Sequence, residues 1–305
     1  MIRIGTRASQ LALWQANLAK TQLEKLGYQA QIIGITSTGD EVLDKPLHQI
    51  GGFGLFTKTL DNAMLRGEID IAVHSLKDVP TTLHEKIAQA AVLKRANISD
   101  VLVLKTNADF LKNQESAIIA TGSLRRKAQW LHKYPKHTIV ELRGNVNTRL
   151  QKLIDNDWNG TIFAAAGLER IELLPKNHLM LDDWMIPAPA QGAIMVTALK
   201  ADTEILEICA QINHKDTEIA VAVERQFMKT LEGGCTAPIG GNAKITGETI
   251  SFKGILIAID GSEKVEVEKS LPLSEWHSLG KICAEEVLNN GGRKLMESIK
   301  AEMRK

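Results

Sequence analysis

Apolar residues in the first 200 positions alternate between short β-branched runs and longer stretches with helical spacing. The run from Ile2 to Thr6 predicts a strand, and Ser9 is well placed to cap the helix that follows, because its hydroxyl can accept a hydrogen bond from the first turn. Gly27 predicts the end of that helix. Further strands are expected at 30–36 and 70–76, with a helix between them.

A second series of the same kind begins near residue 100. Its strands are predicted at 101–106, 117–121, 138–142 and 161–166. Helices are predicted to begin after Ser123 and near Asn145. Segments 93–100 and 185–193 are polar or proline-broken and bracket this series, and a strand at 193–199 follows. We therefore expect the chain to leave a first lobe, build a second one and return.

Residues 214–305 follow a different pattern. Asp216 is predicted to cap a helix that runs to Leu231, and three strand-like segments follow, separated by turn signals at Gly247 and at Asp260–Gly261. The whole pattern predicts two similar doubly wound α/β lobes joined by a two-stranded hinge, as in periplasmic binding proteins, and a small α+β domain with a three-stranded antiparallel sheet. The expected domains are 1–95 with 193–213, 96–192, and 214–305.

Composition narrows the possible functions. The 305 residues are 44% hydrophobic and 24% charged, as in globular proteins, and we find neither a signal peptide nor an apolar run that could span a membrane. The 37 basic and 36 acidic residues nearly cancel and aromatic residues make up only 4%, so nucleic acid is not an expected partner. The three cysteines form no CxxC pair, so we expect no metal site and a cytoplasmic location. No long apolar surface stripe indicates an obligate dimer, so we expect a monomer.

Arginines recur where predicted strands give way to helices. Arg7 follows the first strand, and the others stand in "ATGSLRR", "ELRGNVNTRL" and "AAAGLER" as Arg125, Arg126, Arg143, Arg149 and Arg170. Ligands of open α/β sheets bind beyond the carboxyl ends of strands, where helix N-termini favour anions. One such arginine is more often a structural ion pair, but four junctions together favour a polyanionic ligand.

Asp78, in "VHSLKDVP", is the clearest acid–base candidate. An aspartate two residues before a proline usually only initiates a turn. In a site rich in arginines, however, a single carboxylate could hold a cationic intermediate or move protons. His74 and Ser75 are nearby, but no complete Ser–His–Asp arrangement is recognisable.

Cys235 follows two glycines in "LEGGCTAPIG". A lone cysteine is more often a small packed hydrophobic residue than a reactive group. From its surroundings in the sequence, Cys235 could be a core residue, a nucleophile or a covalent anchor.

Eight segments, taken in order, resemble those of the porphobilinogen deaminase (hydroxymethylbilane synthase) family. They are "IRIGTRASQLALWQA", "GLFTK", "DIAVHSLKDVPT", "GSLRRKAQ", "ELRGNVNTRL", "AAAGLER", "PAPAQGA" and "EGGCTAPIG". The resemblance implies a transferase of tetrapyrrole and haem biosynthesis that joins four porphobilinogen units head to tail, releasing ammonia from each, into linear hydroxymethylbilane. It also implies one covalent dipyrromethane cofactor per chain, with porphobilinogen and the growing oligopyrrole as partners.

The resemblance also assigns roles to residues. Cys235 would carry the cofactor through a thioether, and Asp78 would be catalytic: it would bind pyrrole N–H groups, assist loss of ammonia and stabilise the azafulvenium cation. The residues expected around the cofactor are Ser75, Lys77, Thr121, Ser123, Arg125, Arg126, Arg143 and Gly144. Those expected around the substrate are Arg7, Ser9, Arg149, Arg170 and Gln191.

Four positions depart from the family pattern. Gln49 and Phe53 stand in a glycine-rich loop, expected to act as a lid, where family members often carry lysines. Ala190 stands where glycine is expected, and Gly122 stands where serine is usual.

Three other functions compete with the one that the resemblance implies. A solute-binding protein could share two lobes around an anion site, but the missing export signal and the thiol argue against it. A cysteine hydrolase or acyl transferase needs a histidine base, and none of the eight histidines is near Cys235 in sequence. RNA binding is disfavoured by the scarcity of aromatic residues and the balanced charge.

Overall fold

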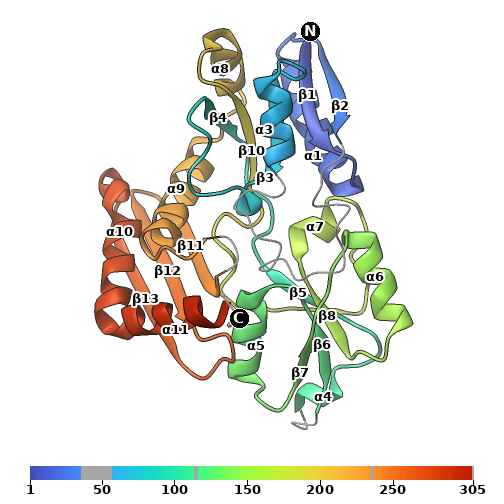
Figure 1. The fold of residues 1–305 in the computed structure, drawn as a ribbon, viewed down its shortest axis with the longest axis vertical. Helices are drawn as coiled ribbons and strands as arrows, with labels where there is room; N and C mark the ends of the chain where they lie inside the picture. The colour runs from blue at the N-terminus through green and yellow to red at the C-terminus, as the bar shows by residue number, and fades with distance from the viewer. Residues whose placement is uncertain (36–56, 113–115, 235–236, 304–305) are drawn as a thin grey trace. The chain divides into compact units, whose positions relative to one another are not determined.

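The computed structural model describes residues 1–35, 57–112, 116–234 and 237–303, which form two compact units (Figure 1). Of these residues, 1–35, 57–96 and 191–219 belong to the first unit, and the others belong to the second. The chain passes between the units at 96–97 and 190–191, within the polar and proline-broken segments of the sequence, and again at 219–220 inside a helix.

The first unit is built on a five-stranded mixed sheet with the order β2-β1-β3-β10-β4 (Figure 1). Its strands are β1 (Ile2–Arg7), β2 (Ala30–Ile35), β3 (Ile71–Ser75), β4 (Ile87–Val92) and β10 (Ile194–Leu199), and its helices are α1 (Gln10–Lys25), α3 (Lys58–Leu65) and α8 (Thr203–Ala210). β1, β2 and β3 are parallel, and β10 runs antiparallel to β3 and β4. The predicted return strand is therefore present, and it lies inside the sheet.

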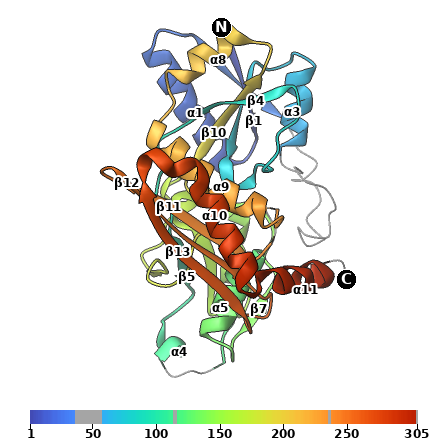
Figure 2. The same cartoon turned by 90° about the vertical axis from the view of Figure 1, so that its left-hand side faces the viewer.

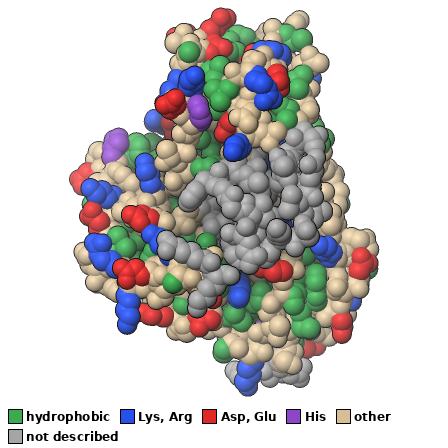
Figure 3. Space-filling view, viewed as in Figure 1, with side chains coloured by type: hydrophobic (Ala, Val, Ile, Leu, Met, Phe, Trp, Pro, Cys, Tyr) green, Lys and Arg blue, Asp and Glu red, His purple; other side chains and the backbone are tan. Residues whose placement is uncertain are grey.

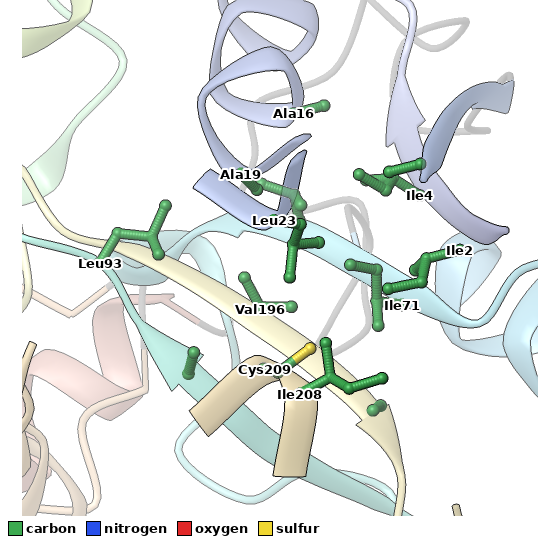
Figure 4. Packing of buried hydrophobic residues seen from close by; sticks show 14 of the residues in the cluster. Ile2, Ile4, Ala16, Ala19, Leu23, Ile71, Leu93, Val196, Ile208 and Cys209 are labelled. Atoms are coloured by element: carbon green, nitrogen blue, oxygen red, sulfur yellow. The ribbon is translucent and has the colours of Figure 1, made fainter. Parts of the chain in front are cut away.

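Helices cover both faces of this sheet. Successive side chains of a strand point to opposite faces, so Ile71 and Val73 pack with α1 and α8 while Ala72 packs with α3. Figure 4 shows Cys209 of α8 within the first of these clusters, beside Ile208 and near Val196. Burial raises the pKa of the Cys209 thiol to about 12. This cysteine is a small core residue that remains protonated at neutral pH.

The second unit contains a sheet of matching design, with the order β7-β6-β8-β5-β9. Its strands are β5 (Asp100–Leu104), β6 (Ile118–Ala120), β7 (Thr138–Val140), β8 (Gly160–Ala164) and β9 (His178–Met180), and its helices are α4 (Asp109–Lys112), α5 (Leu124–Lys133), α6 (Val146–Asp155) and α7 (Ala165–Glu169). β6, β7 and β8 are parallel, and β5 is antiparallel to both of its neighbours. The strand directions follow those of the first sheet, which confirms two similar lobes.

The second unit also contains a three-stranded antiparallel sheet with the order β11-β12-β13. The elements of this part are α9 (Lys215–Thr230, which begins in the first unit), β11 (Ile239–Thr246), β12 (Thr249–Ile257), β13 (Lys264–Pro272), the 3₁₀ turn η2 (Leu273–Glu275), α10 (Trp276–Val287), the π-helical turn η3 (Leu288–Gly292) and α11 (Arg293–Met303). In Figure 2, α10 lies along this sheet, and α11 extends from the end of α10 towards the C-terminus. Gly247 and Gly261 have positive φ at the two hairpin turns, so the predicted α+β part is confirmed.

The sheets of the two lobes are mixed, because β10 and β5 each run antiparallel to their neighbours. One prediction needs correction. α9 begins at Lys215, and the Nδ1 atom of His214 accepts a hydrogen bond from the Thr217 N–H at 3.2 Å. His214 therefore caps α9, and the prediction that Asp216 does so is wrong.

Glu172 occupies a strained backbone conformation after α7, with φ at 57° and an exposed side chain. We expect Glu172→Gly to raise the free energy of unfolding by about 0.5–1 kcal/mol, because relief of the left-handed strain exceeds the extra freedom of glycine in the unfolded chain. Glu172→Ala keeps its Cβ and should leave stability unchanged. Urea unfolding measures both, and equal stability of the glycine and alanine variants would contradict this account.

Candidate active site

The predicted site residues of the first unit gather at one edge of its sheet. β1 and β3 are parallel neighbours, so their carboxyl ends meet there, and β10 begins at the same edge because it runs antiparallel to β3. The residues that reach this edge are Arg7, Ser9, Ser75, Lys77, Asp78 and Gln191. Three separate stretches of sequence therefore supply one edge.

Ser9 and Ser75 are both held by hydrogen bonds. Ser9 caps α1 as predicted, and its Oγ accepts a hydrogen bond from the Ala12 N–H at 3.3 Å. Gln15 is buried on α1, and its Nε2 donates to Ser75 Oγ at 2.9 Å. Gln15 is not among the site residues predicted from the sequence. The signal that could have found it is a polar residue on the same helical stripe as the buried Ala19 and Leu23.

Asp78 lies just beyond β3 in a 3₁₀ turn, η1 (Leu76–Asp78). Strict strand alternation would have placed Lys77 and Asp78 on opposite faces, but the strand ends at Ser75, so that restriction does not apply. Leu76 is buried and anchors the turn, while the Asp78 carboxylate is exposed. A ligand at this edge can reach that carboxylate.

Gln191 is buried and bonded through both its side chain and its backbone. Its Oε1 accepts a hydrogen bond from Lys77 Nζ at 3.2 Å, and its backbone carbonyl accepts one from Arg95 Nε at 2.8 Å. The preceding Ala190 has φ at 64°, which explains why glycine is expected there: glycine adopts this conformation without the Cβ strain that alanine bears. The structure thus brings Lys77 and Gln191 together.

The predicted site residues of the second unit gather at the matching edge of the second sheet. β6, β7 and β8 are parallel, so the three turns that leave them lie at one edge. The residues on these turns and on the helices that follow are Thr121, Ser123, Arg125, Arg126, Arg143, Gly144, Arg149 and Arg170. Each of these strands is followed by a helix, so the predicted strand-to-helix junctions are present, but Arg170 is the C-cap of α7 and does not lie at its start.

The turn after β6 is tight, and its hydroxyls shape it. Ser123 caps α5, and its Oγ accepts from the Arg126 N–H at 3.5 Å, while Thr121 Oγ1 accepts from the Ser123 N–H at 3.3 Å. A Cβ at Gly122 would lie 2.5 Å from the backbone oxygen of Leu142. Glycine in place of the expected serine therefore lets this turn approach the loop after β7.

Arg125 and Arg126 both pair with Asp100, which the sequence analysis did not identify. Arg125 Nη1 lies 2.6 Å from Asp100 Oδ2, and Arg126 Nε and Nη2 lie 2.9 and 2.8 Å from Oδ1. All three side chains are buried. The interpretation of the arginines as structural ion pairs therefore applies to the contacts that Arg125 and Arg126 make with Asp100. The only signal for Asp100 in the sequence is a carboxylate at the start of an apolar strand.

Burial of Arg143 and Arg170 costs free energy, because it removes water from their charged groups. Burial lowers the pKa of Arg170 to about 10, with Glu169 opposing the change, and burial also lowers the pKa of Arg143, with Glu141 opposing it. A lowered pKa in a base means that its charged form is poorly solvated. An anionic ligand would relieve that cost.

The residues beside Cys235 require glycine, although Cys235 itself lies outside the described residues, as do Gln49 and Phe53. Gly234 has φ at 61°, a conformation that favours glycine, and a Cβ at Gly233 would require the side chain of Ile239 to shift.

Charges of both signs are interspersed on the face seen in Figure 3, in keeping with the nearly balanced composition. Within the described part of the chain, no helix is both long and apolar enough to cross a membrane. The same residues contain no group of three His, Cys, Asp or Glu side chains suited to a metal ion.

The fold and the two edges define an α/β protein with an arginine-rich sheet edge in one lobe and an exposed aspartate at the sheet edge of the other. Residues 2–207 match the domain described as "Porphobilinogen deaminase, dipyromethane cofactor binding domain", and residues 218–289 match "Porphobilinogen deaminase, C-terminal domain". The chain belongs to the porphobilinogen deaminase family, and it is a transferase of tetrapyrrole biosynthesis. This membership sets aside the solute-binding, hydrolase and RNA-binding alternatives.

Relatives match along nearly the whole chain. The porphobilinogen deaminase of Pelobacter propionicus is 43% identical over 302 residues, covering 98% of this chain and 97% of the relative. That of Trichlorobacter lovleyi is 41% identical over 301 residues, covering 98% and 96%. Among solved structures, a periplasmic substrate-binding protein of an ABC transporter from Coxiella burnetii matches with a TM-score of 0.44 and 17% identity, covering 70% of this chain and 92% of that one.

His74 of β3 should make the stability of the protein depend on pH. Burial, with a smaller contribution from the charge of Arg7, lowers its pKa from 6.5 to about 4. As the pH decreases, His74 therefore takes up a proton near pH 6.5 in the unfolded chain but only near pH 4 in the folded protein. Stability should fall by about 3 kcal/mol as the pH decreases through this window, and this group contributes no pH dependence above it.

Urea unfolding at several pH values measures this effect. His74→Gln should lose that part of the decline between pH 6.5 and 4, whereas the exposed control His277→Gln should keep it. An unchanged profile in His74→Gln would show that His74 is not the responsible group.

Proposed function

We propose that this chain is a hydroxymethylbilane synthase that polymerises four porphobilinogen units, with release of ammonia from each, on a dipyrromethane primer joined to Cys235. The observation that carries the proposal is the set of arginines at the carboxyl ends of β6, β7 and β8, within the matched cofactor-binding domain. Each pyrrole of such a primer bears two carboxylates, and the guanidinium fork is suited to binding them.

The second unit supplies most of the residues for the cofactor. In this proposal Arg125, Arg126 and Arg143 bind carboxylates, the hydroxyls of Thr121 and Ser123 donate hydrogen bonds, and the backbone N–H of Gly144 adds another. A buried atom fits this role: Arg125 Nε has no hydrogen-bond partner among the described residues. Ser75 and Lys77 add donors from the first unit. When bound, the cofactor supplies a pyrrole α-carbon as the nucleophile.

Asp78 is the catalytic residue of the proposal. Its exposed carboxylate accepts hydrogen bonds from pyrrole N–H groups, stabilises the positive charge left on the substrate as ammonia departs, and takes up a proton afterwards. The substrate carboxylates are assigned to Arg7, Ser9, Arg149, Arg170 and Gln191. No role in this scheme calls for a metal ion.

The same proposal covers the organisation of the protein. Its domains are 1–95 with 193–213, 96–192, and 214–305; it acts as a monomer, and its partners are porphobilinogen and the growing oligopyrrole. A cytoplasmic location is supported by Cys209 and Cys283, which are buried as free thiols.

Intact-mass measurement tests the covalent anchor. The purified protein should be heavier than its sequence by one dipyrrole, and Cys235→Ser should have the bare mass. Cys209→Ser and Cys283→Ser are matched controls that should keep the addition, because burial keeps both thiols protonated. A bare mass in the parent, or an addition retained in Cys235→Ser, would refute the assignment.

Asp78→Asn tests the catalytic role. The amide keeps the shape of the side chain but removes the charge that stabilises the cation, so the rate of porphobilinogen consumption should fall by on the order of 100–1000-fold. The variant should still carry the dipyrrole, as measured by intact mass. Asp216→Asn, at an exposed position of α9, should retain the parent rate. Turnover of Asp78→Asn at the parent rate would remove Asp78 from the mechanism.

A further inference from the structure

Asp100 stands at the arginine-bearing edge of the second sheet. It is the first residue of β5, which runs antiparallel to β8, and it pairs in register with Ala164 at the carboxyl end of β8. Its carboxylate is fully buried. The topology therefore places an acidic side chain beside the turns from which Arg125 and Arg126 extend.

The contacts around Asp100 fix both guanidinium groups. Arg125 reaches both carboxylate oxygens, at 2.6 and 3.3 Å, and its Nη1 also donates to the Ile186 carbonyl at 2.9 Å. Arg126 donates from Nε to Oδ1 at 2.9 Å and from Nη1 to the Ile162 carbonyl at 3.0 Å. Each arginine is thus held between one shared carboxylate and one backbone oxygen.

The charges of these three side chains do not cancel. Two guanidinium groups and one carboxylate leave one net positive charge, in a place where Arg125 and Arg126 are 4% and 6% exposed. Both arginines also lie in the first turn of α5, where the helix dipole disfavours positive charge. Asp100 stabilises two adjacent buried arginines, and an anionic ligand at this edge would balance the charge that remains on the three side chains.

We propose that Asp100 is a positioning residue for cofactor binding: it holds Arg125 and Arg126 at the sheet edge and balances one of their two charges, so that a cofactor carboxylate balances the other. The inference rests on the proposed function, which assigns both arginines to the cofactor. Asp100 itself does not touch the cofactor in this scheme. It acts through the two arginines.

If Asp100 has this role, its loss should lower the stability of the unloaded protein more than that of the loaded protein. Asp100→Asn keeps the size of the side chain but removes its charge and turns one acceptor into a donor, which faces a guanidinium. Without the cofactor, two buried positive charges then have no balancing carboxylate within the cluster. With the cofactor bound, its carboxylate supplies part of what Asp100 supplied.

Thermal unfolding of four proteins tests this difference as a double-mutant cycle. The loaded pair is the parent and Asp100→Asn, each verified by intact mass to carry the dipyrrole. The unloaded pair is Cys235→Ser and Cys235→Ser/Asp100→Asn. Asp100→Asn should lower the Tm by about 10 °C in the unloaded pair and by roughly half as much in the loaded pair. Equal losses in the two pairs would overturn the proposal.

Asp70, in the first unit, provides a control because it also pairs with an arginine but is not a predicted site residue. It accepts hydrogen bonds from Arg3 through N, Nε and Nη2 at 2.7, 3.1 and 2.6 Å. Asp70→Asn should therefore lower the Tm equally in loaded and unloaded proteins. This result is expected of a carboxylate whose role is only structural.

A charge-balanced variant covers the case in which Asp100→Asn does not fold. Asp100→Asn/Arg125→Gln removes one charge of each sign, so it should fold in the unloaded form and recover most of the lost Tm. If it unfolds as readily as the single variant, Asp100 does not act by balancing Arg125 and the proposal fails. Absence of any dipyrrole on the parent would instead refute the proposed function, so the two failures are distinguishable.

Discussion

The site depends on keeping several guanidinium groups dehydrated at one sheet edge without unfolding the protein. Burial of a charge is costly unless a partner compensates for it. At Arg125 and Arg126, Asp100 and two backbone carbonyls provide that compensation, and at Arg170 the residual cost is visible as a lowered pKa. Asp100 thus balances part of the positive charge at this edge, which is compatible with the proposed binding of cofactor carboxylates there.

The two sheets share one geometry but carry different side chains at their edges. In each sheet the parallel strands end at one edge, and an antiparallel strand begins there. The first unit uses its edge to present the exposed carboxylate of Asp78 on a short turn, and the second uses its edge for arginines on helix starts.

Local features of the structure were largely predictable from the sequence. Ser9, Ser123 and Asn145 cap helices as expected, because a cap depends only on residues within one turn. The β-branched strands were also predicted. β4 was not, because its alanines and glutamine have weak strand propensity and its pairing with β10 determines its conformation.

Long-range pairs were the features that the sequence did not reveal. Asp100 is 25 residues from Arg125, and Gln15 is 60 residues from Ser75, so no local spacing links them. His214 was missed as a cap because a histidine ring seldom has this role, whereas Asp216 has a side chain typical of it. The family motifs supplied the roles of residues such as Lys77 and Gln191, whose hydrogen bond only the folded chain could show.

The two buried thiols acquire a further meaning in an enzyme that generates carbon electrophiles. Burial raises the pKa of Cys209 to about 12 and that of Cys283 to about 11, so at neutral pH almost none of either sulfur is the reactive thiolate. A cation that escapes capture would find neither sulfur ready to attack it. The core thus gains resistance to self-alkylation, and sulfur chemistry can be confined to one position of the chain.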